Sequence, residues 1–158
     1  MNVLQLMSRN VKTCRTNDNL GCAARIMWEE DVGCVPLLDD EGHLVGMLTD
    51  RDIAMGAYTQ GRPLDEIPAS IAMSRDLFSC LESDTILHAE ETMRQHRVRR
   101  LPVTDQAGML VGLISLGDIA REAETERGRQ RRQISQQEVA ATLAEISAPR
   151  SPREIARV

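Results

Sequence analysis

The chain of 158 residues is long enough for one compact domain or for two small halves packed tightly together, and its core needs no disulfide or metal. Its formal net charge of −5 argues against general binding of nucleic acid, which depends on lysines and arginines that neutralise phosphates. No stretch is long and apolar enough to span a membrane, and the N-terminus lacks the pattern of a secretory signal, so we expect a cytoplasmic protein.

The side-chain inventory limits the chemistry further. Only three residues are aromatic, so the core is expected to consist of aliphatic side chains. The four cysteines include no CxxC pair, and the three histidines do not complete a spacing typical of zinc sites. We therefore expect reduced, buried thiols and no required metal.

The sequence contains a duplicated unit. Residues 7–54 and residues 73–120 align at a constant offset of 66 without a gap, and chance does not preserve register over so many positions. The matching pairs include Met7/Met73, Ser8/Ser74, Cys14/Cys80, Asp18/Asp84, Ala23/Ala89, Pro36/Pro102, Gly42/Gly108, Gly46/Gly112, Thr49/Ser115 and Asp52/Asp118.

The first copy predicts five elements in chain order. A short extended segment, VKTC (11–14), precedes the helix NLGCAARIMWEE (19–30), whose apolar residues recur with helical spacing. VGCVPLL (32–38) and HLVGMLT (43–49) are predicted strands joined by a glycine-containing turn, and a second helix begins after Thr49. Each unit is therefore β-α-β-β-α.

These elements predict an α+β fold in which the two units pack by their exposed sheet faces about a pseudo-twofold axis. The basic run RGRQRR (127–132) is interpreted as the solvated end of the helix that begins at Ser115. The expected boundaries are 1–61 for the first repeat, 62–72 for an exposed linker, 73–127 for the second repeat and 128–158 for a C-terminal helical extension.

The C-terminal extension predicts an amphipathic helix. Ser135 and Glu138 have the spacing of a capping box at its start. Val139, Leu143 and Ile146 share one face, by which the helix is expected to dock on the two repeats, a second subunit or a partner. SPRE (151–154) has the pattern of one further short helix start, which is marginal by itself.

The order of elements, with the runs VPLLDDEGHLVGMLTDRDI (35–53) and RLPVTDQAGMLVGLISLGDI (100–119), resembles a tandem pair of CBS (cystathionine-β-synthase) domains over about residues 3–125. The resemblance implies a non-catalytic regulatory module whose clefts between the repeats bind an adenosyl ligand. AMP is the expected ligand, and ADP, ATP, S-adenosylmethionine and NAD are alternatives.

The resemblance also implies a homodimer that transmits a change of shape to an unknown protein partner. The surfaces expected to form the dimer are the apolar helix faces around Ala23, Met27, Ala89 and Met93. A scaffold or dimerisation protein with degenerate clefts remains an alternative. Catalysis is disfavoured because the sequence has no P-loop or Rossmann glycine pattern and its histidines have no evident companions.

Two helix starts carry the first candidate site residues. Thr49-x-x-Asp52 and Ser115-x-x-Asp118 have the spacing of an N-cap hydroxyl followed by a first-turn acid, which is sufficient reason for these residue types. The same positions suit nucleotide binding, since helix amides attract phosphate. The CBS resemblance implies ribose on the aspartate and phosphate on the hydroxyl residue.

The second candidate group is Arg99 and Arg100 in QHRVRRLPV. One interpretation is that one or both reach a phosphate, for which guanidinium groups are suited. The alternative is one exposed arginine and one satisfied by a surface carboxylate. The first repeat has Gly33 and Cys34 at the corresponding positions. We therefore expect two unequal clefts: the Asp52 cleft with both arginines, and the other with the uncharged pair.

Three further residues lie on the short extended segments that open each repeat: Lys12, Thr13 and Ser79. The CBS resemblance implies that these segments line the adenine pocket, largely through backbone groups. Because aromatic residues are scarce, adenine is expected to lie between aliphatic side chains.

Overall fold

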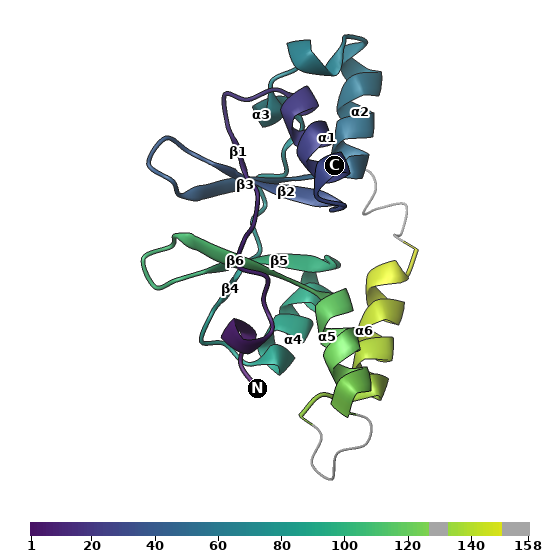
Figure 1. Ribbon diagram of the computed structural model, residues 1–158. Coiled ribbons are helices and arrows are strands. Elements are labelled where there is room, and N and C mark those ends of the chain that lie inside the picture. Colours follow the sequence, from purple (N-terminus) through teal and green to yellow (C-terminus); the bar gives the residue numbers. More distant parts are fainter. Residues whose placement is uncertain (127–132, 150–158) are drawn as a thin grey trace.

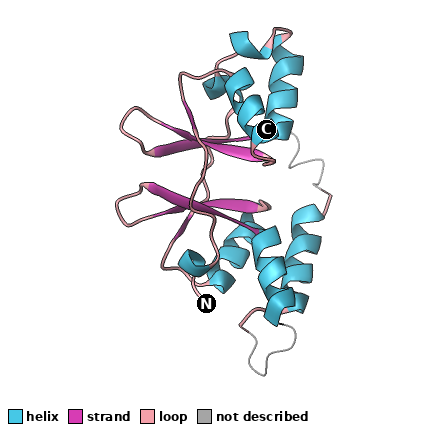
Figure 2. Ribbon diagram, viewed as in Figure 1, coloured by secondary structure: helices cyan, strands magenta, loops and turns pink. Residues whose placement is uncertain are grey.

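The computed structural model describes residues 1–126 and 133–149. Two three-stranded sheets face each other across the middle of the molecule, and helices cover their outer sides (Figure 2). In each sheet the short first strand runs parallel to the second strand, which pairs antiparallel with the third. The strands are β1 (Cys14–Arg15), β2 (Cys34–Leu38) and β3 (Leu44–Thr49) in the first sheet, and β4 (Cys80–Leu81), β5 (Arg100–Thr104) and β6 (Leu110–Ser115) in the second.

The helices confirm the duplicated β-α-β-β-α unit (Figure 1). The first repeat contributes α1 (Leu20–Glu29) and α2 (Asp50–Gln60), and the second contributes α4 (Ile86–His96) and α5 (Leu116–Thr125). Shorter helical pieces are η1 (Val3–Gln5), η2 (Leu64–Glu66) and α3 (Ala69–Ala72). No helix among residues 1–126 and 133–149 is long and apolar enough to cross a bilayer.

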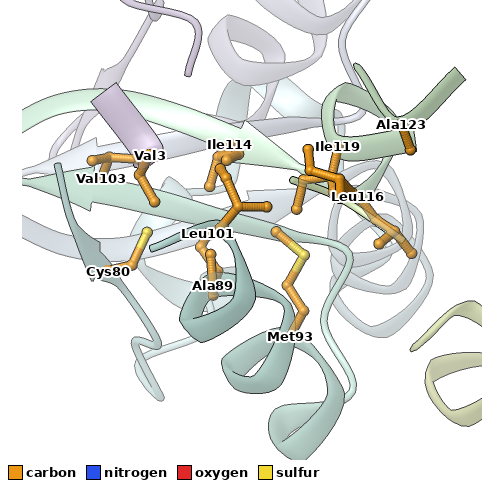
Figure 3. Close-up of a cluster of buried hydrophobic side chains, with 12 residues drawn as sticks. Val3, Cys80, Ala89, Met93, Leu101, Val103, Ile114, Leu116, Ile119 and Ala123 are labelled. Atoms are coloured by element: carbon orange, nitrogen blue, oxygen red, sulfur yellow. The ribbon is translucent and has the colours of Figure 1, made fainter. Parts of the chain in front are cut away.

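Each repeat has its own aliphatic core, as the composition predicted. In the second repeat, apolar side chains from η1, the three strands, α4 and α5 meet between the sheet and its helices (Figure 3). The core of the first repeat is built in the same way and includes Leu20, Ala23, Val35, Leu37 and Leu48. Trp28 and Tyr58 lie outside both cores, with 88% and 82% of their surface exposed.

The segments before each repeat pack on the opposite repeat. Val3 is fully buried in the second core, and its amide donates to the carbonyl of Asp84 at 2.9 Å. Ile67 and Ala69 are fully buried in the first core. The predicted linker 62–72 therefore contains core residues rather than only exposed ones.

Backbone pairing makes this exchange symmetrical. Ser8 bridges Leu113 of β6, and Ser74 bridges Met47 of β3. Both pairs are related by the offset of 66, so residues 1–8 and residues 67–74 play equivalent parts. The exchange also fills the space beside the strand glycines: a Cβ on Gly46 would lie 2.5 Å from the Met73 sulfur. The equivalent Gly112 meets the sulfur of Met7 in the same way.

The C-terminal extension forms α6 (Gln136–Ser147), which packs against α4 and α5. The predicted cap is present, since the Ser135 hydroxyl accepts from the Glu138 amide at 3.4 Å. The predicted docking face is wrong in one residue. Val139 and Ile146 pack against the second core, but Thr142 is the fully buried side chain and Leu143 is 47% exposed. The runs 127–132 and 151–154 lie outside the described residues.

The apolar helix faces expected to form a dimer are not free. Ala23, Ala89 and Met93 are fully buried inside the two cores, and Met27 packs against the first core. A helix face that already covers its own sheet cannot also bury a second subunit. The exposed apolar side chains on these two helices are instead Trp28 of α1 and Leu87 of α4.

Candidate functional site

The start of α2 forms a complete capping box. The Thr49 hydroxyl accepts from the Asp52 amide at 3.2 Å, and Asp52 Oδ2 accepts from the Thr49 amide at 2.8 Å. The Thr49 hydroxyl also donates to Asp52 Oδ2 at 2.7 Å. Ser115 and Asp118 repeat the arrangement at the start of α5, with corresponding distances of 3.1, 2.9 and 2.6 Å. The capping interpretation of both motifs is therefore confirmed.

The amides at the start of α2 already have acceptors within the protein. The Asp50 amide faces the Gly33 carbonyl at 3.4 Å, and the Arg51 amide donates to Asp50 Oδ1 at 2.8 Å. With the Thr49 and Asp52 amides in the capping box, the first turn has few donors left for an anion. A phosphate at this site would depend on side chains rather than on the helix amides.

Asp52 and Asp118 differ in the hydrogen bonding of their second carboxylate oxygen, Oδ1. Asp118 Oδ1 accepts from the Arg121 guanidinium, so both of its oxygens are occupied. At the offset of 66, Met55 stands in the place of Arg121. Asp52 Oδ1 consequently makes no hydrogen bond with any of the described residues. This oxygen can accept from hydroxyl groups of a ligand.

A cleft of about 720 Å³ lies between the two repeats and brings four of the predicted residues together: Thr49, Asp52, Arg99 and Arg100. Four arginines and three aspartates line it, which makes its walls slightly positive in a chain of net charge −5. The complete lining is Gly33, Cys34, Met47, Thr49, Asp50, Arg51, Asp52, Met55, Ser74, Asp76, Phe78, Arg97, Val98, Arg99, Arg100 and Pro102.

Arg99 directly precedes β5 and Arg100 is its first residue, and both side chains are exposed. Neither guanidinium forms an ion pair or hydrogen bond with the described part of the chain. The expectation that a surface carboxylate satisfies one of them is therefore not met. Two unpaired guanidinium groups lie in the same cleft as the available oxygen of Asp52.

The expected assignment of Gly33 and Cys34 to a different cleft is wrong. Both residues line the same cleft as Arg100, and a Cβ on Gly33 would lie only 3.3 Å from Arg100 Nη2. Glycine at this position thus leaves room for the guanidinium. Burial raises the pKa of the Cys34 thiol, and the nearby Arg100 charge acts in the opposite direction.

The remaining predicted residues are not brought into this cleft. Asp118 borders a smaller hollow of about 230 Å³ with Leu6, Arg121, Glu122 and Thr125. Ser115, Lys12, Thr13 and Ser79 line neither hollow within the described ranges. The Lys12 ammonium lies 3.9 Å from a carboxylate oxygen of Glu30, the residue that directly follows α1.

Sequence reasoning missed an aromatic side chain in the cleft. Phe78 lines it from the segment before β4, and its ring stacks on His96 with centroids 3.6 Å apart. Phe78 directly precedes the predicted Ser79, and alternation along an extended segment puts the two on opposite sides. Phe78 could have been predicted from the sequence as a cleft residue. It is one of only three aromatic residues and directly precedes a predicted adenine-pocket residue, and an aromatic ring is a suitable surface for a base.

The family profile of the CBS domain matches residues 3–56 and 66–124. The chain belongs to the CBS domain family. It is 41% identical over 118 residues to the CBS domain-containing protein YhcV of Bacillus subtilis, which covers 75% of this chain and 82% of that protein. The two matches agree with the two structural repeats, so this is a tandem CBS pair.

Solved structures of other CBS proteins superpose on most of the chain. The structure of hypoxic response protein I with two coordinated zinc ions has a TM-score of 0.70 at 30% identity, covering 77% of this chain and 98% of that one. The CBS pair of MJ0100 with 5′-methylthioadenosine and S-adenosyl-L-methionine has a TM-score of 0.71 at 26% identity, covering 80% and 98%. PAE2072 of Pyrobaculum aerophilum, complexed with AMP, has a TM-score of 0.69 at 26% identity, covering 75% and 90%.

Proposed function

We propose that this CBS pair binds an adenine nucleotide with a terminal phosphate, AMP in the simplest case, in the cleft between the repeats. The observation that carries the proposal is the placement of an available Asp52 oxygen and two unpaired arginines in one cleft. Its volume of about 720 Å³ falls within the range usual for small-molecule sites, roughly 300–1,000 Å³.

Each part of a nucleotide has a suitable surface in the cleft. Asp52 Oδ1 can accept from the ribose hydroxyls while Oδ2 remains in the capping box. Arg99 and Arg100 can form charge-assisted hydrogen bonds with the phosphate. The base can lie against the apolar part of the lining, where Phe78 and Met47 offer an aromatic and a polarisable surface.

The ligands of the related structures fit the same chemistry. One relative was crystallised with AMP and another with 5′-methylthioadenosine and S-adenosyl-L-methionine, so both kinds of adenosyl ligand are candidates for this chain. The two unpaired arginines favour a ligand that carries a phosphate over the sulfonium ligand. ADP and ATP satisfy this requirement as AMP does, whereas NAD carries its phosphates only as an internal diphosphate.

The position of the cleft suggests how binding would act on a partner. Its walls come from both repeats, with Asp52 on the first and Arg100 on the second. A ligand that binds both walls stabilises the relative positions of the repeats in which those contacts are made. The proposed role is therefore a non-catalytic regulatory module whose bound and free shapes differ for a protein partner.

A thermal-shift panel with AMP, ADP, ATP, NAD, S-adenosylmethionine and adenosine tests this function. We expect the phosphate-bearing adenine ligands to raise the melting temperature in a concentration-dependent manner, because ligands that bind only the folded state stabilise it. Adenine absorbance released by heat from the purified protein would support the same conclusion. No shift with any ligand and no released adenine would favour the alternative, a scaffold protein with degenerate clefts.

A further inference from the structure

Outside the cleft, the first repeat gathers two thiols and a carboxylate. Ligand atoms of Cys14, Asp18 and Cys22 all lie within 4.8 Å of one another. The two sulfurs are 3.9 Å apart, and no disulfide joins them. None of these three residues lines the nucleotide cleft, so the proposed function does not use them.

Local structure holds this group in place. Cys14 belongs to β1, and a tight turn follows in which the Arg15 amide donates to Asp18 Oδ2 at 2.7 Å. The Asn19 side chain then caps α1 by accepting from the amide of Cys22 at 2.9 Å. The strand, the turn and the capped helix therefore bring the three side chains together through backbone geometry that is independent of any ligand.

The sulfur separation matches the edge of a tetrahedral metal site. With zinc–sulfur bonds of about 2.3 Å, two thiolates at the tetrahedral angle lie roughly 3.8 Å apart. We propose that Cys14, Asp18 and Cys22 form a binding site for a thiophilic divalent cation of the zinc class. Three protein ligands leave the fourth position of a tetrahedron for water.

Burial and charge fit an ion at this position. Cys14 is 1% exposed, while Cys22 and Asp18 are only partly buried, so an ion can enter from the side of Cys22. Two thiolates and a carboxylate would exceed the charge of a divalent ion by one, and Arg25 is close enough to act on Cys14 electrostatically.

The second repeat has an equivalent group of three possible ligands, but these do not lie close together. At the offset of 66, the equivalent residues are Cys80, Asp84 and His88, which offer a sulfur, a carboxylate and an imidazole nitrogen in place of the second sulfur. His88 Nε2 lies 4.0 Å from Asp84 Oδ2, but the three residues do not form a common cluster in the described structure. We therefore expect one ion for each chain, bound in the first repeat.

Titration of the metal-free, fully reduced chain with Co²⁺ tests the site. Thiolate-to-cobalt charge-transfer absorption and intense visible bands of tetrahedral cobalt should appear and saturate at one equivalent, and Zn²⁺ should abolish them. Cys22→Ala removes a partly buried ligand from a helix that tolerates alanine well, and Asp18→Asn keeps an oxygen acceptor for the turn. Each variant should weaken binding at least tenfold without lowering the melting temperature of the metal-free protein by more than a few degrees.

Cys80→Ser is the matched control, since it alters the equivalent cysteine of the second repeat and should leave the cobalt spectrum unchanged. The proposal is overturned if the wild-type chain shows no thiolate–cobalt band, or if Cys80→Ser loses the band while Cys22→Ala keeps it. A mass lower by two hydrogen atoms under non-reducing conditions, a difference absent in Cys22→Ala, would indicate an internal disulfide. Together with no cobalt band after reduction, it would identify a redox-active dithiol instead of a metal site. AMP binding is measured separately, so failure of either proposal leaves the other intact.

Discussion

Asp52 and Asp118 cap their helices in the same way, but only Asp118 also binds an arginine one turn later. The difference arises from a single position in the duplicated unit, which is Met55 in the first copy and Arg121 in the second. An aspartate whose second oxygen already accepts a charge-assisted hydrogen bond must lose it before it can bind a ribose. The two equivalent carboxylates are therefore unequal as ligand acceptors.

Asp52→Ala should abolish the strong phase of AMP binding in titration calorimetry, whereas Asp118→Ala should leave it nearly intact. Both changes remove the same hydrogen bonds between the first-turn aspartate and the N-cap residue, and Asp118→Ala also removes the ion pair with Arg121. Because exposed ion pairs contribute little to stability, the effects of the two changes on the melting temperature should be similar. The pair thus separates the loss of a ligand contact from the loss of a helix cap. Equal retention of AMP by both variants would contradict the assignment of ribose to Asp52.

Arg100→Ala should weaken AMP far more than adenosine, because only AMP carries the phosphate. A charge-assisted hydrogen bond contributes about 1.5–3 kcal/mol, which corresponds to roughly tenfold or more in affinity. Calorimetry with both ligands on the wild type and the variant measures this difference. Equal losses for AMP and adenosine would mean that the arginine serves the fold rather than the phosphate.

Much of the candidate site could be predicted residue by residue, and the rest depended on contacts between distant segments. The Thr49-x-x-Asp52 spacing defines a local cap, and the resemblance placed Arg99 and Arg100 beside it. The space beside Gly46 could not be predicted in the same way. Met73, which fills it, comes from a segment that pairs with β3 across the molecule, and no local pattern predicts that pairing.

Helix α6 shows what periodicity can and cannot decide at the scale of an element. The cap at Ser135 and the apolar spacing predicted a helix that is present. Positions three and four residues after Val139 lie on either side of the same stripe, so spacing alone does not choose between Thr142 and Leu143. Packing against α4 and α5 buries the threonine, and its hydroxyl oxygen has no partner there.

The contact between α4 and α6 also contains a buried acid. Glu90 of α4 is 2% exposed, and its Oε1 has no hydrogen-bond partner among the described residues. Burial and, to a smaller extent, the nearby Glu138 carboxylate of α6 together raise the pKa of Glu90 to about 7, although the Arg94 charge acts in the opposite direction. The folded protein therefore holds a proton on Glu90 that the unfolded chain releases at lower pH.

The stability of the protein should fall as pH rises from about 4.5 to about 7, the interval between the ordinary pKa of a glutamate and that of folded Glu90. Glu90→Gln should remove this dependence and stabilise the protein above pH 7, by roughly 2–3 kcal/mol at most. Denaturant melts at several pH values measure the effect. Glu91→Gln, on the exposed side of the same helix, is the control, and an identical pH profile for both variants would contradict the role of Glu90.

At the scale of the whole molecule, the duplicated fold and the facing sheets could be predicted from the repeat, since two half-exposed sheets can cover each other. The surface that forms a dimer could not be predicted in this way, because helical periodicity identifies an apolar face but not the segment that packs against it. Ala23 and Met93 face the cores of their own repeats. The large apolar side chains that remain exposed on α1 and α4 are Trp28 and Leu87, at positions that the duplication does not match, since the offset of 66 pairs Trp28 with Arg94 and Leu87 with Gly21.

We predict that the protein is a homodimer in which Trp28 and Leu87 are buried between subunits. Light scattering at tens of micromolar should give twice the mass of 17.6 kDa. Trp28→Glu should shift the mass toward the monomer, because it places a charge in the contact, whereas Tyr58→Glu on α2 should not. A monomer mass for the wild type would exclude the dimer at that concentration.

Residues 1–8 and 67–74 each pack on the opposite repeat, and this affects where the chain can be divided into folding units. The boundary of the duplication and the boundary of the packed halves do not coincide, because the opening segment of each copy completes the core of the other. Neither copy is thus a self-sufficient folding unit, and opening one core releases chain that the second core requires. We therefore expect the two cores to unfold together in one cooperative step rather than half by half.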